Sequence, residues 1–126
     1  MTTRYFTVEE ANALLPEIKP LMAALLERRA KIVGTRHQLA DIIDDISSNV
    51  GSPAASAMVL DFMAIEQLLG RIRAYGCQVK DLNVGLLDFL AEIDGREVYL
   101  CWRFGEERIE HYHDLHTGFM SRQRLR

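Results

Sequence analysis

The dipeptide Asp94–Gly95 constrains the fold of this chain more than any other feature, because it separates two runs in which apolar and polar residues alternate. Asp-Gly between such runs is the strongest short-range signal for a β-hairpin with a two-residue turn. If these residues form the turn, Ile93 lies opposite Arg96 and the pairing of both strands follows. The sequence therefore predicts an antiparallel hairpin with a defined register.

That register divides the hairpin into an apolar face and a polar face. The apolar face consists of three opposed pairs, which are Leu87 with Trp102, Phe89 with Leu100, and Ala91 with Val98. On the other face Asp88 lies opposite Cys101, and Leu86 lies opposite Arg103. A continuous apolar face is what packing on helices requires, and a one-residue slip would turn it to solvent.

A third alternating run follows the hairpin. Its first face carries Ile109, His111, His113 and Leu115. An odd connection to the second strand places His111 beside Cys101, in line with Asp88, whereas an even connection turns both histidines toward the helices. The sequence leaves both alternatives open, because Gly105 can adopt a positive φ in either case.

The first half of the chain has the apolar period of helices. Thr7 and Glu10 form a capping-box pair, which starts a short helix over Val8–Leu15. Pro16 disfavours the continuation of that helix, so a break is expected there. A long helix is then expected from about Leu21 to Ile46.

A second long helix is expected from Pro53, with Ser52 as its N-cap, to about Val79. Each helix has a seam, which is a line of mostly apolar residues at alternating spacings of four and three. The seam of the first helix consists of Ile18, Met22, Leu25, Arg29, Ile32, Arg36, Leu39, Ile43 and Ile46. The seam of the second consists of Met58, Phe62, Ile65, Leu69, Ile72, Gly76 and Val79. Joined by a short turn-rich connector, the helices are expected to pack antiparallel as a hairpin. They are longer than a small sheet can cover, and the leftover apolar seam predicts a homodimer through the long helices.

These elements predict one α+β domain over residues 1–126. Its helical part, residues 7–80, consists of the short N-terminal helix and the long antiparallel helical hairpin. The helices pack on a small C-terminal antiparallel β-sheet of two to three strands over residues 85–116, and residues 117–126 form a tail. A length of 126 residues is within the usual range of a single domain.

Composition narrows the classes of partner. Apolar residues make up 48% of the chain, charged residues 26%, and the net charge is −3, so only the short tail from Arg122 to Arg126 is basic. No segment has the length of apolar residues that a membrane span needs, and the N-terminus lacks the apolar region of a secretory signal. We therefore expect a cytoplasmic protein with neither a membrane nor a nucleic-acid partner, in which Cys77 and Cys101 are reduced thiols.

Ionisable side chains are dense in the last third of the chain. The candidates for binding a small ligand are Asp88, Arg103, Glu106 and Arg122. His111 and His113 are the candidates for binding a divalent metal ion, because an His-x-His pair in a strand projects two imidazoles to one side. Asp88 or Glu106 would add an oxygen ligand, and Cys101 would add a sulfur ligand.

Three interpretations of this cluster follow. In the favoured one the protein is a small dimeric interaction or assembly module with a polar, ligand-binding patch on its sheet, and Asp88 pairs diagonally with Arg103. The alternative is a divalent-metal-binding protein, with metal-assisted hydrolysis as one activity open to it, that uses Asp88, Glu106 and His113. A third interpretation has Cys101 as a nucleophile, activated by His111 that Asp88 orients. The residues decide neither whether the protein is an enzyme nor which small molecule it would bind.

Several motifs also resemble those of a known family. They are Gly85–Phe89, Val98–Glu106 and Ile109–His113, then Gly118, Phe119 and Arg122, with the opening segment Phe6–Pro16. On these residues nearly the whole chain resembles domain-of-unknown-function family 2203, an uncharacterised bacterial family. The chain departs from that pattern at Leu87, Leu90, Phe104 and Tyr112, where the family has valine, proline, leucine and tryptophan, whereas Asp88, Glu106 and His113 are in place and His111 and His116 fall outside it. The resemblance implies a shared fold and no particular chemistry.

Overall fold

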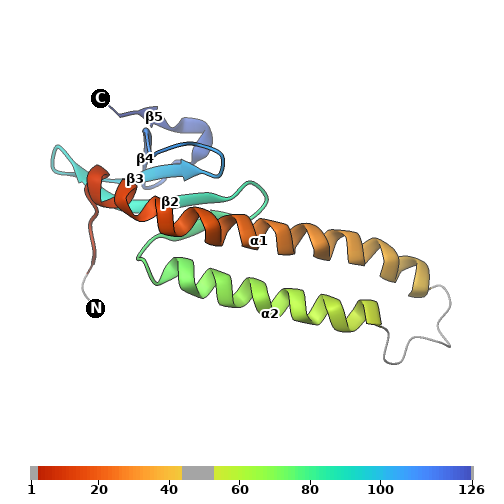
Figure 1. Ribbon diagram of the computed structural model, residues 1–126. Coiled ribbons are helices and arrows are strands. Elements are labelled where there is room, and N and C mark those ends of the chain that lie inside the picture. Colours follow the sequence, from red (N-terminus) through yellow and green to blue (C-terminus); the bar gives the residue numbers. More distant parts are fainter. Residues whose placement is uncertain (1–2, 44–52, 126) are drawn as a thin grey trace.

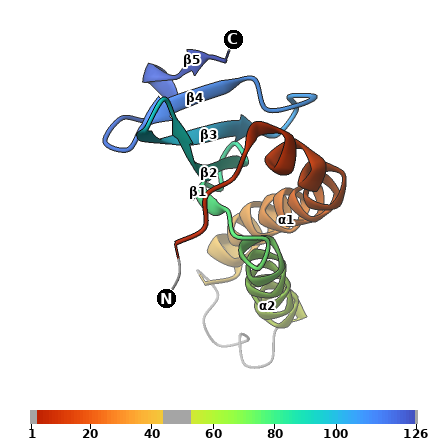
Figure 2. The ribbon, with the colours of Figure 1, turned by 90° about the vertical axis from the view of Figure 1, so that its left-hand side faces the viewer.

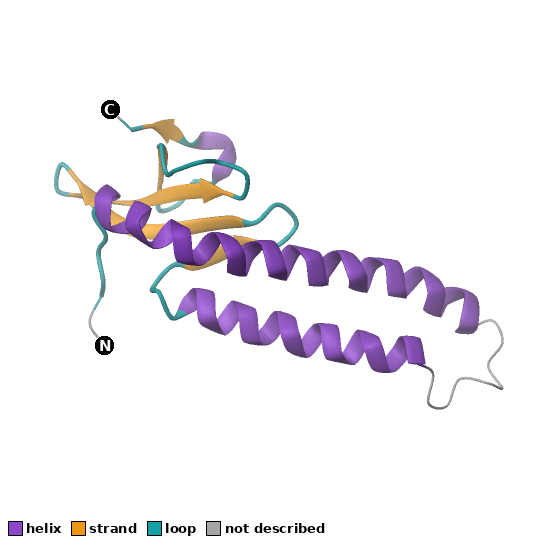
Figure 3. Cartoon of the chain, in the orientation of Figure 1, coloured by secondary structure: helices purple, strands orange, loops and turns teal. Residues whose placement is uncertain are grey.

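A computed structural model describes the backbone of residues 3–43 and 53–125 and the side chains of residues 3–35, 53 and 55–125. Within these residues the chain forms two helices and a five-stranded antiparallel sheet (Figures 1 and 3). The elements are α1 (Val8–Ile43), α2 (Pro53–Arg73), β1 (Gln78–Asp81), β2 (Leu86–Ile93), β3 (Arg96–Arg103), β4 (His111–Asp114), a short 3-10 helix η2 (Phe119–Ser121) and β5 (Gln123–Arg124). The α+β class is therefore confirmed, and the strands lie in the sheet in the order of the chain.

The first helix begins where the sequence predicts and continues where the sequence predicts a break. The backbone N–H of Thr7 donates to Glu10 Oε1, and the N–H of Glu10 donates to Thr7 Oγ1, both at 3.0 Å, so the capping box is confirmed. The helix then runs unbroken through Pro16 and Pro20 to Ile43. The separate short helix over residues 8–15 is therefore wrong, since those residues are the first part of α1.

Packing explains why α1 tolerates two prolines. Pro16 and Pro20 are exposed, whereas Leu15 and Ile18 lie buried in the core beside them. A proline inside a helix costs about 3 kcal/mol. Burial of one large apolar side chain contributes about 1.5–3 kcal/mol, so the apolar face of α1 offsets much of that cost and keeps the helix continuous.

The helices α1 and α2 lie side by side and run in opposite directions beyond the sheet (Figures 1 and 2). The two helices are unequal in length, with 36 and 21 residues. The connector of the expected helical hairpin lies outside the described residues, and so do Ser52 and the expected end of the first long helix. The second helix does begin at Pro53, but it ends at Arg73 and not near Val79. Gly76, with a φ of 99°, turns the chain into β1.

The predicted seams are right for α1 and partly wrong for α2. In α1 the apolar side chains of the seam from Ile18 to Ile32 are buried, and the later seam side chains lie outside the described ones. In α2 the side chain of Phe62 is 51% exposed, and Asp61 is buried in its place. Arg28 explains this shift, because its Nη1 donates to Asp61 Oδ1 at 2.9 Å across the two helices.

The register of the central hairpin is confirmed at every pair, from Ile93 opposite Arg96 to Leu86 opposite Arg103. Asp94 and Gly95 have φ values of 53° and 76°, as a two-residue turn with positive φ at both positions requires. All six residues of the predicted apolar face lie in the core that the sheet shares with the helices.

The number of strands exceeds the two to three expected. β1 lies within the segment 7–80 that was assigned to helices, and β5 lies within the predicted tail 117–126. β1 pairs with β2 through a register irregularity between Val79 and Asp81, and β5 pairs with β4 over two residues. Such short, largely exposed strands have no apolar alternation, so the pattern that reveals β2 and β3 cannot reveal them.

Candidate functional site

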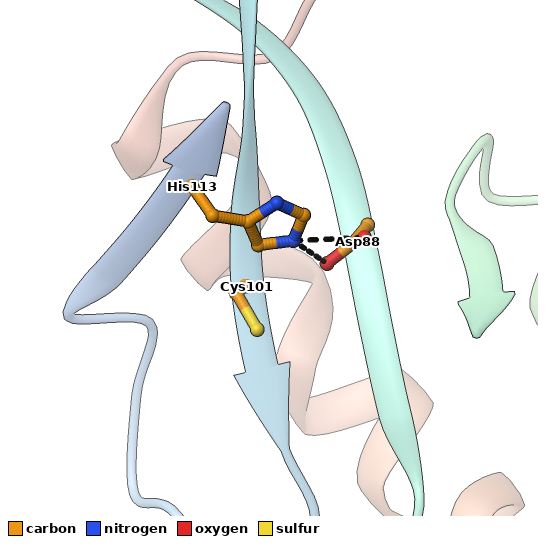
Figure 4. Close-up of side chains that lie close together, drawn as sticks. All are labelled: Asp88, Cys101 and His113. Atoms are coloured by element: carbon orange, nitrogen blue, oxygen red, sulfur yellow. Dashed lines mark hydrogen bonds and ion pairs between the residues drawn. The ribbon is translucent and has the colours of Figure 1, made fainter. Parts of the chain in front are cut away.

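Three neighbouring strands bring Asp88, Cys101 and His113 together (Figure 4). Asp88 on β2 lies opposite Cys101 on β3, and Cys101 lies opposite His111 on β4. The odd connection between the second and third runs is therefore right. The three side chains are 1%, 0% and 3% exposed, and their oxygen, sulfur and nitrogen donor atoms all lie within 4.8 Å of one another. We refer to Asp88, Cys101 and His113 as the buried triad.

The hydrogen bonds of His113 fix the number of protons at the triad. Its Nδ1 lies 2.8 Å from the backbone oxygen of Asp114, which can only accept, so Nδ1 carries a proton. Its Nε2 lies 3.1 Å from both carboxylate oxygens of Asp88. A hydrogen bond there needs one more proton, carried either by Nε2 or by the carboxyl group. The pair is electrically neutral in both cases.

Burial governs the acid–base properties of the triad. Burial raises the pKa of Asp88 above its ordinary value of 3.8, and the opposing influence of His113 does not cancel that effect. Burial, reinforced by the charge of Asp88, raises the pKa of Cys101 to about 12. Cys101 is therefore a protonated thiol at neutral pH. Because Asp88 binds His113 and not His111, the arrangement expected for a cysteine nucleophile is not formed.

The other predicted site residues gather around Glu106. Arg122 donates to both carboxylate oxygens of Glu106, at 3.0 and 2.8 Å, and the backbone N–H of Arg103 donates to the same group at 2.7 Å. Partial burial acts to raise the pKa of Glu106, but these hydrogen bonds outweigh it and the pKa is lowered. His111 Nδ1 lies 3.8 Å from Glu106 Oε2, beyond hydrogen-bond distance.

The two clusters divide the candidates that the sequence put together. Within the described residues, the group of potential metal donors includes Asp88 and His113 but neither Glu106 nor His111, and Cys101 supplies the third atom. The diagonal ion pair between Asp88 and Arg103 is not among the ion pairs of the described residues, since Asp88 binds His113 instead.

An aromatic side chain connects the two clusters at the surface of the sheet. The guanidinium carbon of Arg122 lies 4.2 Å from the centroid of the Phe119 ring, and that of Arg103 lies 5.7 Å from it. Arg122 also acts on Cys101, because it opposes the rise in the pKa of that thiol that burial causes. The segment around η2 is therefore held over the polar face of the sheet by Glu106, Arg122 and Phe119.

A small cavity of about 110 Å³ adjoins the buried triad. Asp88 and His113 line it together with Lys80, Tyr99 and Phe119. Sequence reasoning missed these three lining residues. Strand alternation would have placed Tyr99 on the face of Cys101, whereas Lys80 belongs to the unexpected strand β1. A larger hollow of about 570 Å³ lies between the hairpin turn and the C-terminal residues, but it includes no member of the triad.

A second surface of interest is the side of α2 that faces away from α1. Four large apolar side chains lie there, namely Val59, Leu60, Phe62 and Met63, which are 58%, 62%, 51% and 61% exposed. We refer to these four residues as the outer face of α2. On the side toward α1, Asp61 is only 6% exposed and pairs with Arg28. Among the described residues, no helix is both long enough and apolar enough to span a membrane.

Comparison with known proteins places the chain in a family. A family model for DUF2203, described as an uncharacterised conserved protein, matches residues 4–125. No curated protein and no solved structure matches the chain. The matched range includes both helices, all five strands and every residue of the two polar clusters. The chain therefore belongs to the DUF2203 family of uncharacterised conserved proteins.

Proposed function

We propose that this protein is a homodimeric assembly module, in which the helices form the dimer interface and the sheet carries a site for a small ligand. The observation that supports the dimer is the outer face of α2, where four large apolar side chains are exposed on one helix. The observation that supports the ligand site is the buried triad beside a cavity.

The polarity of α2 is inverted near Asp61. A helix at the surface of a protein normally directs its apolar residues inward and its charged residues outward. Here the charged Asp61 faces α1, whereas Val59, Leu60 and Met63 face away from it. A helix that is apolar on nearly all sides is typical of one that is buried on all sides. The outer face of α2 is therefore suited to contact with another protein surface.

A second copy of the chain is the occupant that fits this face. The four side chains leave on the order of 400 Å² of apolar surface, a patch of the size that marks interaction sites. Two copies related by a twofold axis would cover about twice that area and would need only flanking residues to reach the ~1,200 Å² of a stable interface. None of the four side chains is charged, although Glu66 lies exposed one turn further along α2, and apolar side chains are complementary to themselves across a twofold axis.

Substitution of one exposed residue tests the dimer. We expect sedimentation equilibrium to show a dimer for the wild type and a monomer for Met63→Glu, with unchanged circular dichroism because the side chain is exposed in the single chain. Val33→Glu is the matched control, since Val33 is an exposed apolar residue of α1. A wild type that stays monomeric at high concentration, or a Val33→Glu variant that dissociates as fully as Met63→Glu, would contradict the assignment.

The proposal also covers the cellular compartment and the source of the protein. We place the module in the cytoplasm of a bacterium, where the free and buried Cys77 and Cys101 would stay reduced. With a net charge of −3 the chain has no electrostatic footprint for nucleic acid, so the proposed partners are a second copy and a small ligand. When the source cells are fractionated, we expect the protein to be recovered in the cytosol.

A metal-assisted hydrolase that uses Glu106 as a ligand is the weaker candidate. Both oxygens of Glu106 are bound by Arg122, and the backbone of Arg103 donates to one of them. A metal ion would have to displace these charge-assisted hydrogen bonds. Within the described residues, Asp88 and His113 are hydrogen-bonded to each other and no arginine or lysine binds their side chains, so the buried triad is the better place for a ligand.

A further inference from the structure

We propose that Asp88, Cys101 and His113 bind a transition-metal ion, with zinc(II) as the best chemical match. The inference names the ligand of the sheet site in the proposed function and does not depend on the dimer. One carboxylate oxygen, one thiolate sulfur and one imidazole nitrogen form a donor set that zinc accepts. Binding releases two protons to the solvent, that of the Cys101 thiol and the one shared by Asp88 and His113 Nε2. Magnesium and calcium prefer oxygen atoms alone, so the sulfur and the nitrogen select against them.

The distances allow such a centre with small adjustments. Around a tetrahedral zinc ion, donor atoms lie roughly 3.3–3.6 Å apart, as its bond lengths of about 2.0–2.3 Å require. In the triad the donor atoms lie within 4.8 Å of one another, and His113 Nε2 is already 3.1 Å from each oxygen of Asp88. The three residues come from adjacent paired strands, which hold their backbones in place.

The surroundings of His113 favour a metal ligand. An imidazole that binds a metal ion through one nitrogen usually donates its other N–H to a backbone carbonyl or a carboxylate, which fixes the tautomer. Nδ1 of His113 meets that condition through its 2.8 Å contact with the backbone oxygen of Asp114. The nitrogen that remains, Nε2, points to Asp88 (Figure 4). The positive charge of Arg122 would likewise stabilise the thiolate of Cys101.

Stability alone gives little reason for these residues. A buried acid–base pair contributes about as much as well-packed apolar residues of the same size, or less. Leu or Val at these positions would continue the apolar pattern of β2 and β3 without leaving polar atoms to satisfy. A bound ion would account for an aspartate, a cysteine and a histidine that are buried side by side, because all three can coordinate one metal ion.

The cavity supplies the remaining coordination position. Three protein ligands with a fourth position open to water are the composition of zinc centres that bind exchangeable ligands. The cavity of about 110 Å³ is lined by Asp88 and His113, and at about 30 Å³ per molecule it has room for roughly three waters. Tyr99 and Phe119 contribute aromatic side chains to its lining.

Titration with cobalt(II) tests the site, because cobalt takes zinc positions and absorbs light. The full-length protein is purified without an affinity tag, treated with a chelator and desalted. We expect one cobalt ion per chain, a thiolate-to-cobalt charge-transfer band, and displacement by zinc but not by magnesium. The same stoichiometry is expected for the Met63→Glu variant, so failure of the dimer and failure of the metal site are distinguishable.

Five variants assign the ligands. Cys101→Ser should abolish the charge-transfer band, and Asp88→Asn and His113→Ala should each weaken zinc binding by about 100-fold or more, the upper end of the loss known for outer-shell residues. Cys77→Ser and His111→Ala are the controls and should bind as the wild type does, since neither residue belongs to the triad. Circular dichroism confirms that each variant is folded.

Each of three results would overturn the proposal. One is the absence of saturable cobalt and zinc binding at micromolar concentrations in the folded wild type. A second is an equal loss of binding in a control variant and in Cys101→Ser, which nearly preserves the size of the side chain. An ion held without the charge-transfer band would exclude Cys101 and so the triad as drawn in Figure 4.

Discussion

Replacement of Asp88 by asparagine should lower the stability of the protein much less than replacement by alanine. In Asp88→Asn the amide can donate to Nε2 of a neutral His113, whose Nδ1–H still donates to the backbone oxygen of Asp114. The hydrogen bond persists without a charge. We therefore expect Asp88→Asn to lower the free energy of unfolding of the metal-free protein by no more than about 1 kcal/mol, the net value of one hydrogen bond.

Asp88→Ala removes the one hydrogen-bond partner that Nε2 of His113 has among the described residues, at a side chain that is 3% exposed. An unsatisfied buried polar group costs about 1–3 kcal/mol. The space left by the carboxyl group, on the order of 30 Å³, adds about 0.7 kcal/mol at ~24 cal/mol per Å³. The sum of about 2–4 kcal/mol is several times the cost expected for Asp88→Asn, and urea denaturation at pH 7 measures both. Equal losses of unfolding free energy in the two variants would show that His113 does not need a hydrogen-bond partner at position 88.

The difference in stability between the wild type and Asp88→Asn should change with pH in one direction. Burial raises the pKa of Asp88 in the folded state above its ordinary value of 3.8. A group with a raised pKa contributes stability that is complete below the ordinary pKa and is lost as the pH rises through the folded value. The wild type should therefore lose stability relative to Asp88→Asn as the pH rises above about 4. A relative gain over that range would show that the carboxylate form is the one stabilised by folding.

Three further predictions concern the neighbouring residues. Glu106→Gln should lower the free energy of unfolding by about 1–2 kcal/mol, because the neutral amide pairs more weakly with Arg122. Since folding lowers the pKa of Glu106, this contribution should be present above pH 4.5 and should be lost as the pH falls through the pKa of the folded state. Denaturation curves at several pH values measure it. Leu100→Ala in the core should lower the free energy of unfolding by about 2–5 kcal/mol in urea, and a loss below 1 kcal/mol would contradict its place in the core. Cys77 and Cys101, with pKa values raised to about 11 and about 12, should react with a disulfide reagent at pH 8 only after unfolding, and rapid reaction of the native protein would show that they are accessible.

The hairpin could be predicted from sequence because two independent signals agree there. Asp94 and Gly95 specify a turn with positive φ at both positions, and the alternation of β2 and β3 permits one register in which the apolar residues share a face. The same register places Asp88 beside Cys101. The positions of two of the three triad residues therefore follow from local pattern alone.

The rest depends on contacts between distant residues. His111 and His113 share the same alternation, and only the course of the loop before β4 decides that His113 reaches Asp88. The continuous α1 depends on burial of its apolar face, which outweighs the local preference of Pro16. Asp61 is turned inward by an arginine 33 residues earlier in the chain, and no periodic pattern contains that information.

The position of a bound metal ion would show whether the buried triad is a metal site. Crystals of the untagged protein grown with zinc can be measured at wavelengths on both sides of the zinc absorption edge. We expect a single anomalous peak per chain, within bonding distance of Asp88, Cys101 and His113. Zinc found only at exposed groups such as His116, with the contact between Asp88 and His113 intact, would contradict a metal site at the triad.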